Sequence, residues 1–232
     1  METDNRKTEF LPYKIVCERG YGEYEEKKSR FLAEIMPASS VEEAMAFVES
    51  IRKKHYDARH HCFAYVIGRN KEMTRYSDDG EPGGTAGKPI LEVLLGADVT
   101  DTVAVVTRYF GGTLLGTGGL VRAYTQAAKE GMAACRIGRM CYGARMTVGI
   151  AYGDVGRVQH LFETKKVTVQ DSRYTDQVEY DIRVPDKECG DLEKAIIEAT
   201  AGRADLVLAG KEYYMEQMET NQIDKMILTE LK

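Results

Sequence analysis

Two glycine-rich segments of the sequence have the composition of ligand-binding loops. They are Ser77–Leu94 (SDDGEPGGTAGKPILEVL) and Thr107–Tyr124 (TRYFGGTLLGTGGLVRAY). Glycine has no Cβ, so backbone N–H groups in such loops can approach a ligand closely. A pair of tight turns needs glycine as well. Glycine density therefore indicates either a binding site or two turns, and the charged residues nearby must help to decide.

The second segment favours the binding of an anion. It follows an apolar run and leads into a helix that we expect to begin near Leu120, and free N–H groups at a helix N-terminus attract anions. Helix-terminal electrostatics contribute only about 0.3–1 kcal/mol, so side-chain cations must help to hold a phosphate. We expect Arg108 and Arg122 to converge on it. The predicted phosphate-binding residues are Arg108, Gly111, Gly112, Gly116, Gly118, Gly119, Arg122, Lys88, Thr85 and Gly84.

Three carboxylates lie close together at the start of the first segment, at Asp78, Asp79 and Glu81. Carboxylate oxygens suit Mg²⁺ or Ca²⁺. A solvated acidic turn is the simpler interpretation, and we predict no metal site. Each carboxylate is also a candidate partner for Arg108 or Arg122, which is the structural alternative to an anion site.

Histidines and basic residues precede the first segment. His60 and His61 open an apolar run, which makes them candidates for a general base or simple polar neighbours of a core. The residues expected to line the groove are His60, His61, Asp78, Asp79, Glu81, Tyr109 and Tyr124. A basic patch offers phosphate contacts, although a solvated helix end explains it as well. The patch consists of Arg52, Lys53, Lys54 and Arg59.

Familiar nucleotide and nucleophile motifs are incomplete. A P-loop around Gly83–Lys88 would need glycine at Pro82 and serine or threonine at Pro89. A G-x-G-x-x-G pattern from Gly116 has Val121 in its last position, and no serine stands in a G-x-S-x-G elbow. We predict no cofactor.

Composition indicates an ordinary globular protein. The chain has 232 residues, of which 43% are hydrophobic and 30% charged, with a net charge of −5. The start METDNRKTEF lacks the features of a secretory signal, and no apolar run approaches about 20 residues, so we expect a cytoplasmic protein without a membrane segment. Five cysteines without a CxxC pair predict reduced, mostly buried thiols. No strongly basic balance marks a nucleic-acid binder, so such a role needs a local patch.

The first half of the chain alternates strand and helix patterns. Residues 23–36 are predicted to be extended, and Ser40 with Glu43 forms a capping box before a helix that reaches Lys54. Residues 62–67 and 102–107 are predicted to be buried strands, residues 90–95 a short helix, and the residues from Leu120 a longer one.

A second pattern begins near Gly138. It predicts strands at 144–151, 167–169, 178–184 and 206–214, with helices after the first and third, and the strict alternation over 178–184 indicates a half-exposed strand. The order βαββαβ is the ferredoxin-like arrangement. We therefore predict an α+β protein with domains at 1–138 and 139–215 and a C-terminal tail at 216–232.

Six motifs in the first half, taken in order, resemble the signature of the YigZ/IMPACT family. They are Lys28–Phe31 (KSRF), His60–Phe63 (HHCF), Ser77–Pro82 (SDDGEP), Gly84–Leu91 (GTAGKPIL), Thr107–Gly112 (TRYFGG) and Gly116–Tyr124 (GTGGLVRAY). The resemblance implies a first domain of the ribosomal-protein-domain-2 type, like domain IV of elongation factor G, and a small C-terminal domain like domain V of that factor. For bacterial members it implies a link to translation or nucleic acid.

These observations lead to three functional hypotheses. The first is a non-catalytic binding or regulatory protein that docks RNA or a translation component on a groove lined by His60, Arg108, Gly112, Gly118 and Arg122. The second is an enzyme that acts on a phosphorylated small molecule, with phosphate at the helix N-terminus and an acidic residue such as Asp79 as base. The third is a regulator that binds only a protein partner.

Overall fold

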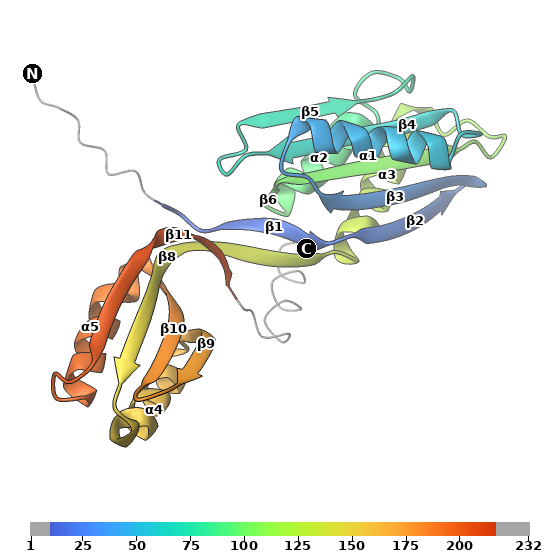
Figure 1. Cartoon of the computed structure of the whole chain (residues 1–232). Coiled ribbons are helices and arrows are strands. Elements are labelled where there is room, and N and C mark those ends of the chain that lie inside the picture. Colours follow the sequence, from blue (N-terminus) through green and yellow to red (C-terminus); the bar gives the residue numbers. More distant parts are fainter. Residues whose placement is uncertain (1–9, 217–232) are drawn as a thin grey trace, which may run out of the picture. The chain divides into compact units, whose positions relative to one another are not determined.

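The computed structural model describes residues 10–216, which form two compact units (Figure 1). Residues 13–139 make up the first unit, and residues 140–216 together with 10–12 make up the second. The predicted C-terminal tail lies outside the described residues, apart from its first residue, Glu216. Between residues 10 and 216, no helix is both long enough and apolar enough to cross a membrane.

The first unit contains most of the strands and the two glycine-rich segments. Its elements are β1 (Tyr13–Glu18), β2 (Gly20–Glu26), β3 (Ser29–Pro37), α1 (Val41–Lys54), β4 (His60–Ile67), β5 (Met73–Ser77), α2 (Gly87–Gly96), β6 (Val99–Thr100), β7 (Thr102–Tyr109) and α3 (Gly116–Ala133). Five of these strands form a sheet in the order β2-β3-β7-β4-β5, in which every neighbouring pair is antiparallel.

Helices cover both faces of this sheet (Figure 1). Strand β4 shows why the predicted apolar run 62–67 is entirely buried. Cys62, Ala64 and Val66 pack with α2 and α3, whereas the alternate residues Phe63 and Tyr65 pack with α1. Because successive side chains of a strand point to opposite faces, a sheet covered on both faces needs apolar residues at every position. The prediction of buried strands at 62–67 and 102–107 is confirmed.

The extended segment predicted at 23–36 is a hairpin of two strands. Lys27 and Lys28 form the two-residue turn, with φ values of 48° and 65°, and Glu26 pairs with Ser29 across it. Such turns need positive φ at both central residues and usually contain asparagine or glycine. Two lysines carry no such signal, which explains why the turn was not predicted.

Helix α1 begins as the sequence predicts. The Ser40 hydroxyl accepts a hydrogen bond from the Glu43 N–H at 3.2 Å. The Glu43 carboxylate accepts from the N–H and hydroxyl of Ser39, at 2.8 and 2.9 Å, rather than from the Ser40 N–H. Both partners of the predicted capping box therefore satisfy donors at this helix terminus.

Glycines bring the backbone of β2 directly against α3. A Cβ at Gly22 would lie 2.2 Å from the nitrogen of Gly131, and one at Gly20 would lie 2.1 Å from the Gly131 oxygen. Gly131 itself lies against Ala33 and Ile35 of β3. No larger residue fits this contact, so these glycines set the distance between the helix and the sheet.

The second unit has the predicted ferredoxin-like arrangement. It contains most of β8 (Arg136–Ile150), followed by a 3₁₀ turn (Tyr152–Asp154), α4 (Val155–Lys165), β9 (Thr168–Tyr174), β10 (Val178–Pro185), α5 (Asp186–Ala199) and β11 (Asp205–Glu216). The strand order is β11-β8-β10-β9. Strand β10 alternates buried and half-buried residues, as predicted. The change of pattern near Gly138 falls inside β8, since this strand begins eight residues before the predicted one.

The contact between β2 and α3 gives a stability prediction. We expect Gly22→Ala to lower the free energy of unfolding by about 2 kcal/mol or more, because the new methyl group overlaps backbone atoms of α3. Gly96→Ala at the end of α2 is the matched control, since a Cβ there meets nothing within 4 Å; its effect should stay within about 0.5 kcal/mol. Urea unfolding measures both changes, and equal stability of the two variants would contradict the close contact.

Candidate functional site

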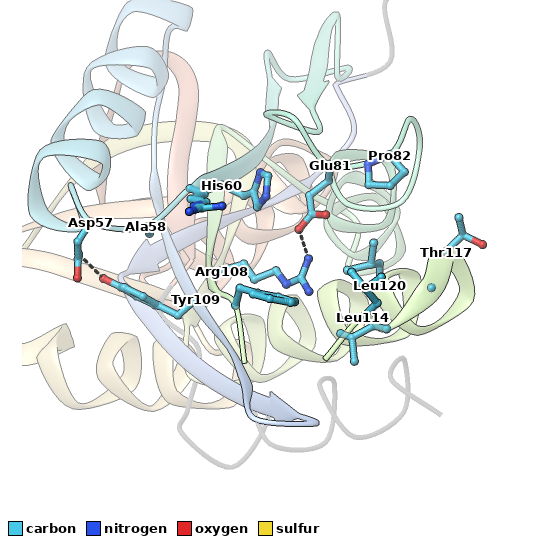
Figure 2. A pocket seen from close by; sticks show the side chains of 14 residues that line it. Asp57, Ala58, His60, Glu81, Pro82, Arg108, Tyr109, Leu114, Thr117 and Leu120 are labelled. Carbon is cyan, nitrogen blue, oxygen red and sulfur yellow. Dashed lines mark hydrogen bonds and ion pairs between the residues drawn. The ribbon is translucent and has the colours of Figure 1, made fainter. Parts of the chain in front are cut away.

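The two glycine-rich segments meet at a cleft of about 860 Å³ in the first unit (Figure 2). Strands β4 and β7 are neighbours, and their pairing places His60 opposite Arg108. The start of β4, the β5–α2 loop and the start of α3 therefore lie at the same end of the strands. The cleft is lined by Asp57, Ala58, Arg59, His60, Glu81, Pro82, Arg108, Tyr109, Phe110, Leu114, Leu115, Gly116, Thr117 and Leu120.

Arg108 is a buried residue with a carboxylate partner. Its Nη1 lies 2.7 Å from Oε1 of Glu81, and the two side chains are only 7% and 4% exposed. The guanidinium also lies 5.5 Å from the ring centroid of Phe31 and 5.6 Å from that of Phe110. Its Nε is buried and has no hydrogen-bond partner among residues 10–216. The structural alternative, pairing of Arg108 with a carboxylate, is thus the arrangement observed.

Helix α3 begins earlier than predicted. It starts at Gly116 rather than near Leu120, so Gly118 and Gly119 belong to its first turn. The predicted start was wrong because glycine is a poor helix former, and a run of glycines resembles a loop. Arg122 consequently lies in the second turn, is exposed and does not line the cleft. The expected convergence of Arg108 and Arg122 is not observed.

The N-terminus of α3 faces the cleft through Gly116 and Thr117. No side chain caps it, since Leu115 stands at the N-cap position without a side-chain hydrogen bond. The first N–H groups of a helix have no partner within the helix. The cleft therefore has backbone donors at one end, and Arg59 contributes an exposed cation elsewhere on its lining.

The carboxylate of Asp78 organises the first glycine-rich segment. It accepts hydrogen bonds from three backbone N–H groups, those of Gly84 at 2.8 Å, Ala86 at 3.0 Å and Gly87 at 2.9 Å. Gly87 is the first residue of α2, so the negative charge also lies at the N-terminus of that helix. The loop folds around Asp78, and the solvated acidic turn predicted here is wrong.

Two further residues of this segment, both predicted to bind phosphate, support the same loop. The N–H and hydroxyl of Thr85 both donate to the Pro82 carbonyl, and Gly84 donates to Asp78. Lys88 is exposed, and its Nζ lies 3.9 Å from Oε1 of Glu92, one turn further along α2. None of Gly84, Thr85 and Lys88 lines the cleft.

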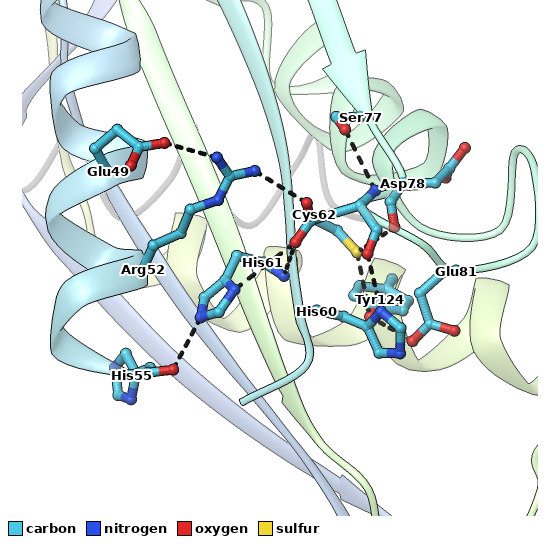
Figure 3. Close-up of polar contacts among 11 residues, drawn as sticks. Glu49, Arg52, His55, His60, His61, Cys62, Ser77, Asp78, Glu81 and Tyr124 are labelled. Carbon is cyan, nitrogen blue, oxygen red and sulfur yellow. Dashed lines mark hydrogen bonds and ion pairs between the residues drawn. The ribbon is translucent and has the colours of Figure 1, made fainter. Parts of the chain in front are cut away.

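Asp79 connects the loop to α1 through Arg52, and Figure 3 shows Arg52 between Glu49 and this loop. Its Oδ1 accepts from Nη2 of Arg52 at 2.9 Å, and its Oδ2 accepts from the backbone N–H of His61 at 2.7 Å. Arg52 also contacts Glu49, and Lys54 pairs with Glu34 at 2.8 Å. In the predicted basic patch, these two cations therefore have carboxylate partners. Lys53 is exposed, and Arg59 is the member of the patch that lines the cleft.

Backbone carbonyls hold both candidate histidines. Nδ1 of His60 lies 2.9 Å from the Asp79 carbonyl, and Nε2 of His61 lies 3.0 Å from the His55 carbonyl. A carbonyl only accepts, so each of these ring nitrogens carries a hydrogen. His60 lines the cleft, whereas His61 is buried outside it.

A buried chain of hydrogen bonds lies behind the cleft. The Cys62 thiol donates to the Asp78 carbonyl at 3.0 Å and contacts the Tyr124 hydroxyl at 3.3 Å, and that hydroxyl donates to Glu81 Oε1 at 2.8 Å. Burial raises the pKa of Cys62 and the pKa of Tyr124 well above their usual values, so both groups keep their protons. Tyr124, predicted to line the groove, is fully buried and instead supports Glu81. All five cysteines are free thiols, and four of them are buried.

Tyr109 holds the side of the cleft formed by the α1–β4 loop. Its hydroxyl donates to Asp57 Oδ1 at 3.0 Å and lies 3.0 Å from Nδ1 of His55. Burial and the bond to Asp57 raise the pKa of Tyr109, so the phenol keeps its proton. This contact fixes Asp57 at the cleft.

Sequence reasoning missed the apolar residues of the cleft. Phe110 and Leu114 are 55% and 84% exposed. Large apolar side chains in a polar loop between a buried strand and a helix were the available signal. In the part of the chain from residue 10 to 216, no cluster of three His, Cys, Asp or Glu side chains is arranged to hold a metal ion.

The fold and cleft define a class of two-domain α+β proteins with a mixed polar and apolar cleft in the first domain. The family described as "Impact N-terminal domain" matches residues 27–132, and a domain of unknown function, DUF1949, matches residues 148–203. The chain is 37% identical over 205 residues to "IMPACT family member YvyE" of Bacillus subtilis, which covers 88% of this chain and 94% of that protein. The chain therefore belongs to the IMPACT family.

Other comparisons agree with this assignment. The chain is 57% identical over 100 residues to "IMPACT family member YigZ" of Escherichia coli, a match that covers 42% of this chain and 49% of that protein. A crystal structure titled as that of a hypothetical protein matches with a TM-score of 0.56 and 34% identity, covering 87% of this chain and 98% of the other.

Asp78 provides a test of the loop architecture. We expect Asp78→Asn to lower the free energy of unfolding by about 2 kcal/mol, because the amide loses the charge and turns its NH₂ group toward a backbone donor. Glu92→Gln makes the same chemical change on the surface of α2 and should cost less than about 0.5 kcal/mol. Chemical denaturation of both variants measures the difference, and a neutral Asp78→Asn would contradict a structural role.

The Glu81–Arg108 pair provides a second test. Arg108→Met should destabilise the protein by about 3–5 kcal/mol, because Glu81 is left buried without its cation. Adding Glu81→Gln should recover part of that loss, since the neutral amide oxygen can still accept a hydrogen bond from the Tyr124 hydroxyl. Urea unfolding of the single and double variants gives the coupling energy. Strictly additive losses in the free energy of unfolding would show that the two side chains do not interact.

Proposed function

We propose that this protein is a non-catalytic binding protein linked to translation, and that it docks RNA through the cleft of its first domain. The observation that carries the proposal is the composition of that cleft. Exposed aromatic and aliphatic side chains lie beside Arg59, His60 and the uncapped N-terminus of α3. Aromatic surfaces next to cations are typical of proteins that bind RNA without catalysis. The resemblance of the family to domains of elongation factor G supports the link to translation.

The balance of charge in the cleft predicts that the affinity for RNA depends only weakly on phosphate contacts. Arg108 is neutralised by Glu81, and Asp57 brings a further negative charge. Arg59 is the remaining cation of the lining, and it makes no ion pair within the described part of the chain. About one phosphate contact therefore contributes to binding, far fewer than in strongly basic nucleic-acid binders.

The enzyme hypothesis loses the base on which it depended. Asp79 does not line the cleft, and its two oxygens accept hydrogen bonds from Arg52 and His61. Glu81, which does line the cleft, has Oε1 occupied by Arg108 and Tyr124. These oxygens already accept hydrogen bonds from protein donors, so they are poorly placed to contact a proton of a substrate. Binding without catalysis is the better account of this arrangement, and a cytoplasmic location agrees with an RNA ligand.

Arg59 is the residue that tests the proposal. We expect Arg59→Glu to weaken the binding of a fluorescent 12-nucleotide RNA by roughly tenfold, because one favourable phosphate contact becomes repulsive. Anisotropy titrations at several salt concentrations should give a slope of log K against log salt of about −0.7 for the parent, and one nearer to zero for the variant.

Arg75→Glu serves as the control. Arg75 is exposed on β5 and lies outside the cleft, so the same change of charge should leave affinity nearly unchanged. Failure of the parent protein to bind RNA, or equal affinities of the two variants, would contradict the proposal.

A further inference from the structure

We infer that the cleft receives the base of one unpaired nucleotide of single-stranded RNA, with the base stacked on Phe110 and its phosphate at the rim. This inference rests on the proposed function and specifies the ligand of the same site. It follows from the separation of apolar, acidic and cationic groups within the cleft.

The walls of the cleft suit a flat apolar group. Phe110, Leu114, Leu115 and Leu120 all line it. The volume of about 860 Å³ lies in the range typical of small-molecule pockets, so a single nucleotide fits and a duplex does not. A base in a duplex would first have to leave its stack, which is unfavourable. The cleft therefore favours a nucleotide that is already unpaired.

Phe110 offers the stacking surface. The Arg108 guanidinium lies 5.6 Å from its ring centroid and holds the ring beside the cleft. The residue is still 55% exposed, so ring surface remains for a base. Stacking of a base on an aromatic side chain is tolerant of sequence and is a main source of affinity in proteins that bind single strands.

The carboxylates of the cleft favour entry of the base over entry of the phosphate. Glu81 and Asp57 both line the cleft, and they repel a phosphate. A base is neutral and carries N–H donors on its edge, which a carboxylate accepts. Oε1 of Glu81 and Oδ1 of Asp57 already accept protein donors, whereas the second oxygen of each has no partner in residues 10–216. The interior thus suits a base better than a phosphate.

Cationic and backbone donors suit the phosphate instead. Arg59 is exposed, and so are Gly116 and Thr117 at the first turn of α3. A phosphate at Arg59 or at the first turn of α3 stays in contact with solvent, because these residues are exposed whereas Glu81 is buried. Phosphate contacts fix the position of a nucleic acid, and contacts to the base add discrimination.

An apolar anchor from a protein partner fits the same cleft less well. It would cover the second oxygens of Glu81 and Asp57 without supplying a donor. Burying a polar group without a hydrogen bond is unfavourable. The base edge provides the missing donors, so the polar groups of the cleft favour a nucleotide.

The test compares single-stranded and duplex RNA on the full chain. A labelled 12-nucleotide RNA and the same strand annealed to its complement are titrated with the parent, Phe110→Ala, Phe110→Tyr and Val121→Ala. We expect the single strand to bind at least tenfold more tightly than the duplex. Phe110→Ala should lose at least about fivefold in affinity for the single strand, whereas Phe110→Tyr keeps the ring and should retain it. Val121 is exposed on α3 outside the cleft and is the matched control.

The outcomes separate this inference from the proposed function. Equal binding of both RNAs, or a neutral Phe110→Ala, together with a loss in Arg59→Glu, would overturn base stacking and leave RNA docking standing. Absence of binding to either RNA would overturn both. The melting temperature of each variant should stay close to that of the parent, since Phe110 is largely exposed and Arg108 keeps its contacts with Glu81 and Phe31. A large loss of melting temperature in Phe110→Ala would mark the ring as structural and contradict the inference.

Discussion

The ion pair between Glu81 and Arg108 is the interaction on which the cleft depends. It joins the two glycine-rich segments, since Glu81 lies in the β5–α2 loop and Arg108 near the end of β7. Removing two charges from water is costly, and the cost is offset only when further hydrogen bonds and contacts satisfy them. Here the Tyr124 hydroxyl and the rings of Phe31 and Phe110 supply those contacts. Glu81, Arg108 and Phe110 are thereby held in the lining of the cleft, and Tyr124 and Phe31 are buried behind them.

Asp78 and Asp79 of the first glycine-rich segment stabilise the loop rather than take part in the cleft. Asp78 gathers three backbone N–H groups of its own loop, and Asp79 binds Arg52 and the start of β4. A loop of this length without regular structure would otherwise leave its backbone groups to water and its ends free to move. With the carboxylates in place, Glu81 enters the cleft in a fixed position.

The resulting site is unlike a strongly basic groove. One of its two arginines, Arg108, is paired with Glu81, and Phe110 and Leu114 are large apolar side chains exposed in its lining. In such a site, stacking and apolar contact contribute more to affinity than counterion release, so affinity should depend only weakly on salt. This balance agrees with the net charge of −5 of the whole chain.

Patterns of local origin were predictable from the sequence by itself. The alternation in β10, the apolar runs of β4 and β7, the Ser40 cap and the βαββαβ order depend on residues close together in the chain, and the structure confirms them. The family was predictable as well, because its motifs are contiguous.

Only the tertiary structure decided which charges meet. Glu81 and Arg108 are 27 residues apart, and so are Arg52 and Asp79. An arginine has the same local signature whether its partner is a phosphate or a buried carboxylate, so the partner depends on sheet pairing and loop closure. The start of α3 was predicted wrongly for a related reason: glycine disfavours a helix locally, and packing of the apolar face from Leu120 to Met132 on the sheet overrides that preference.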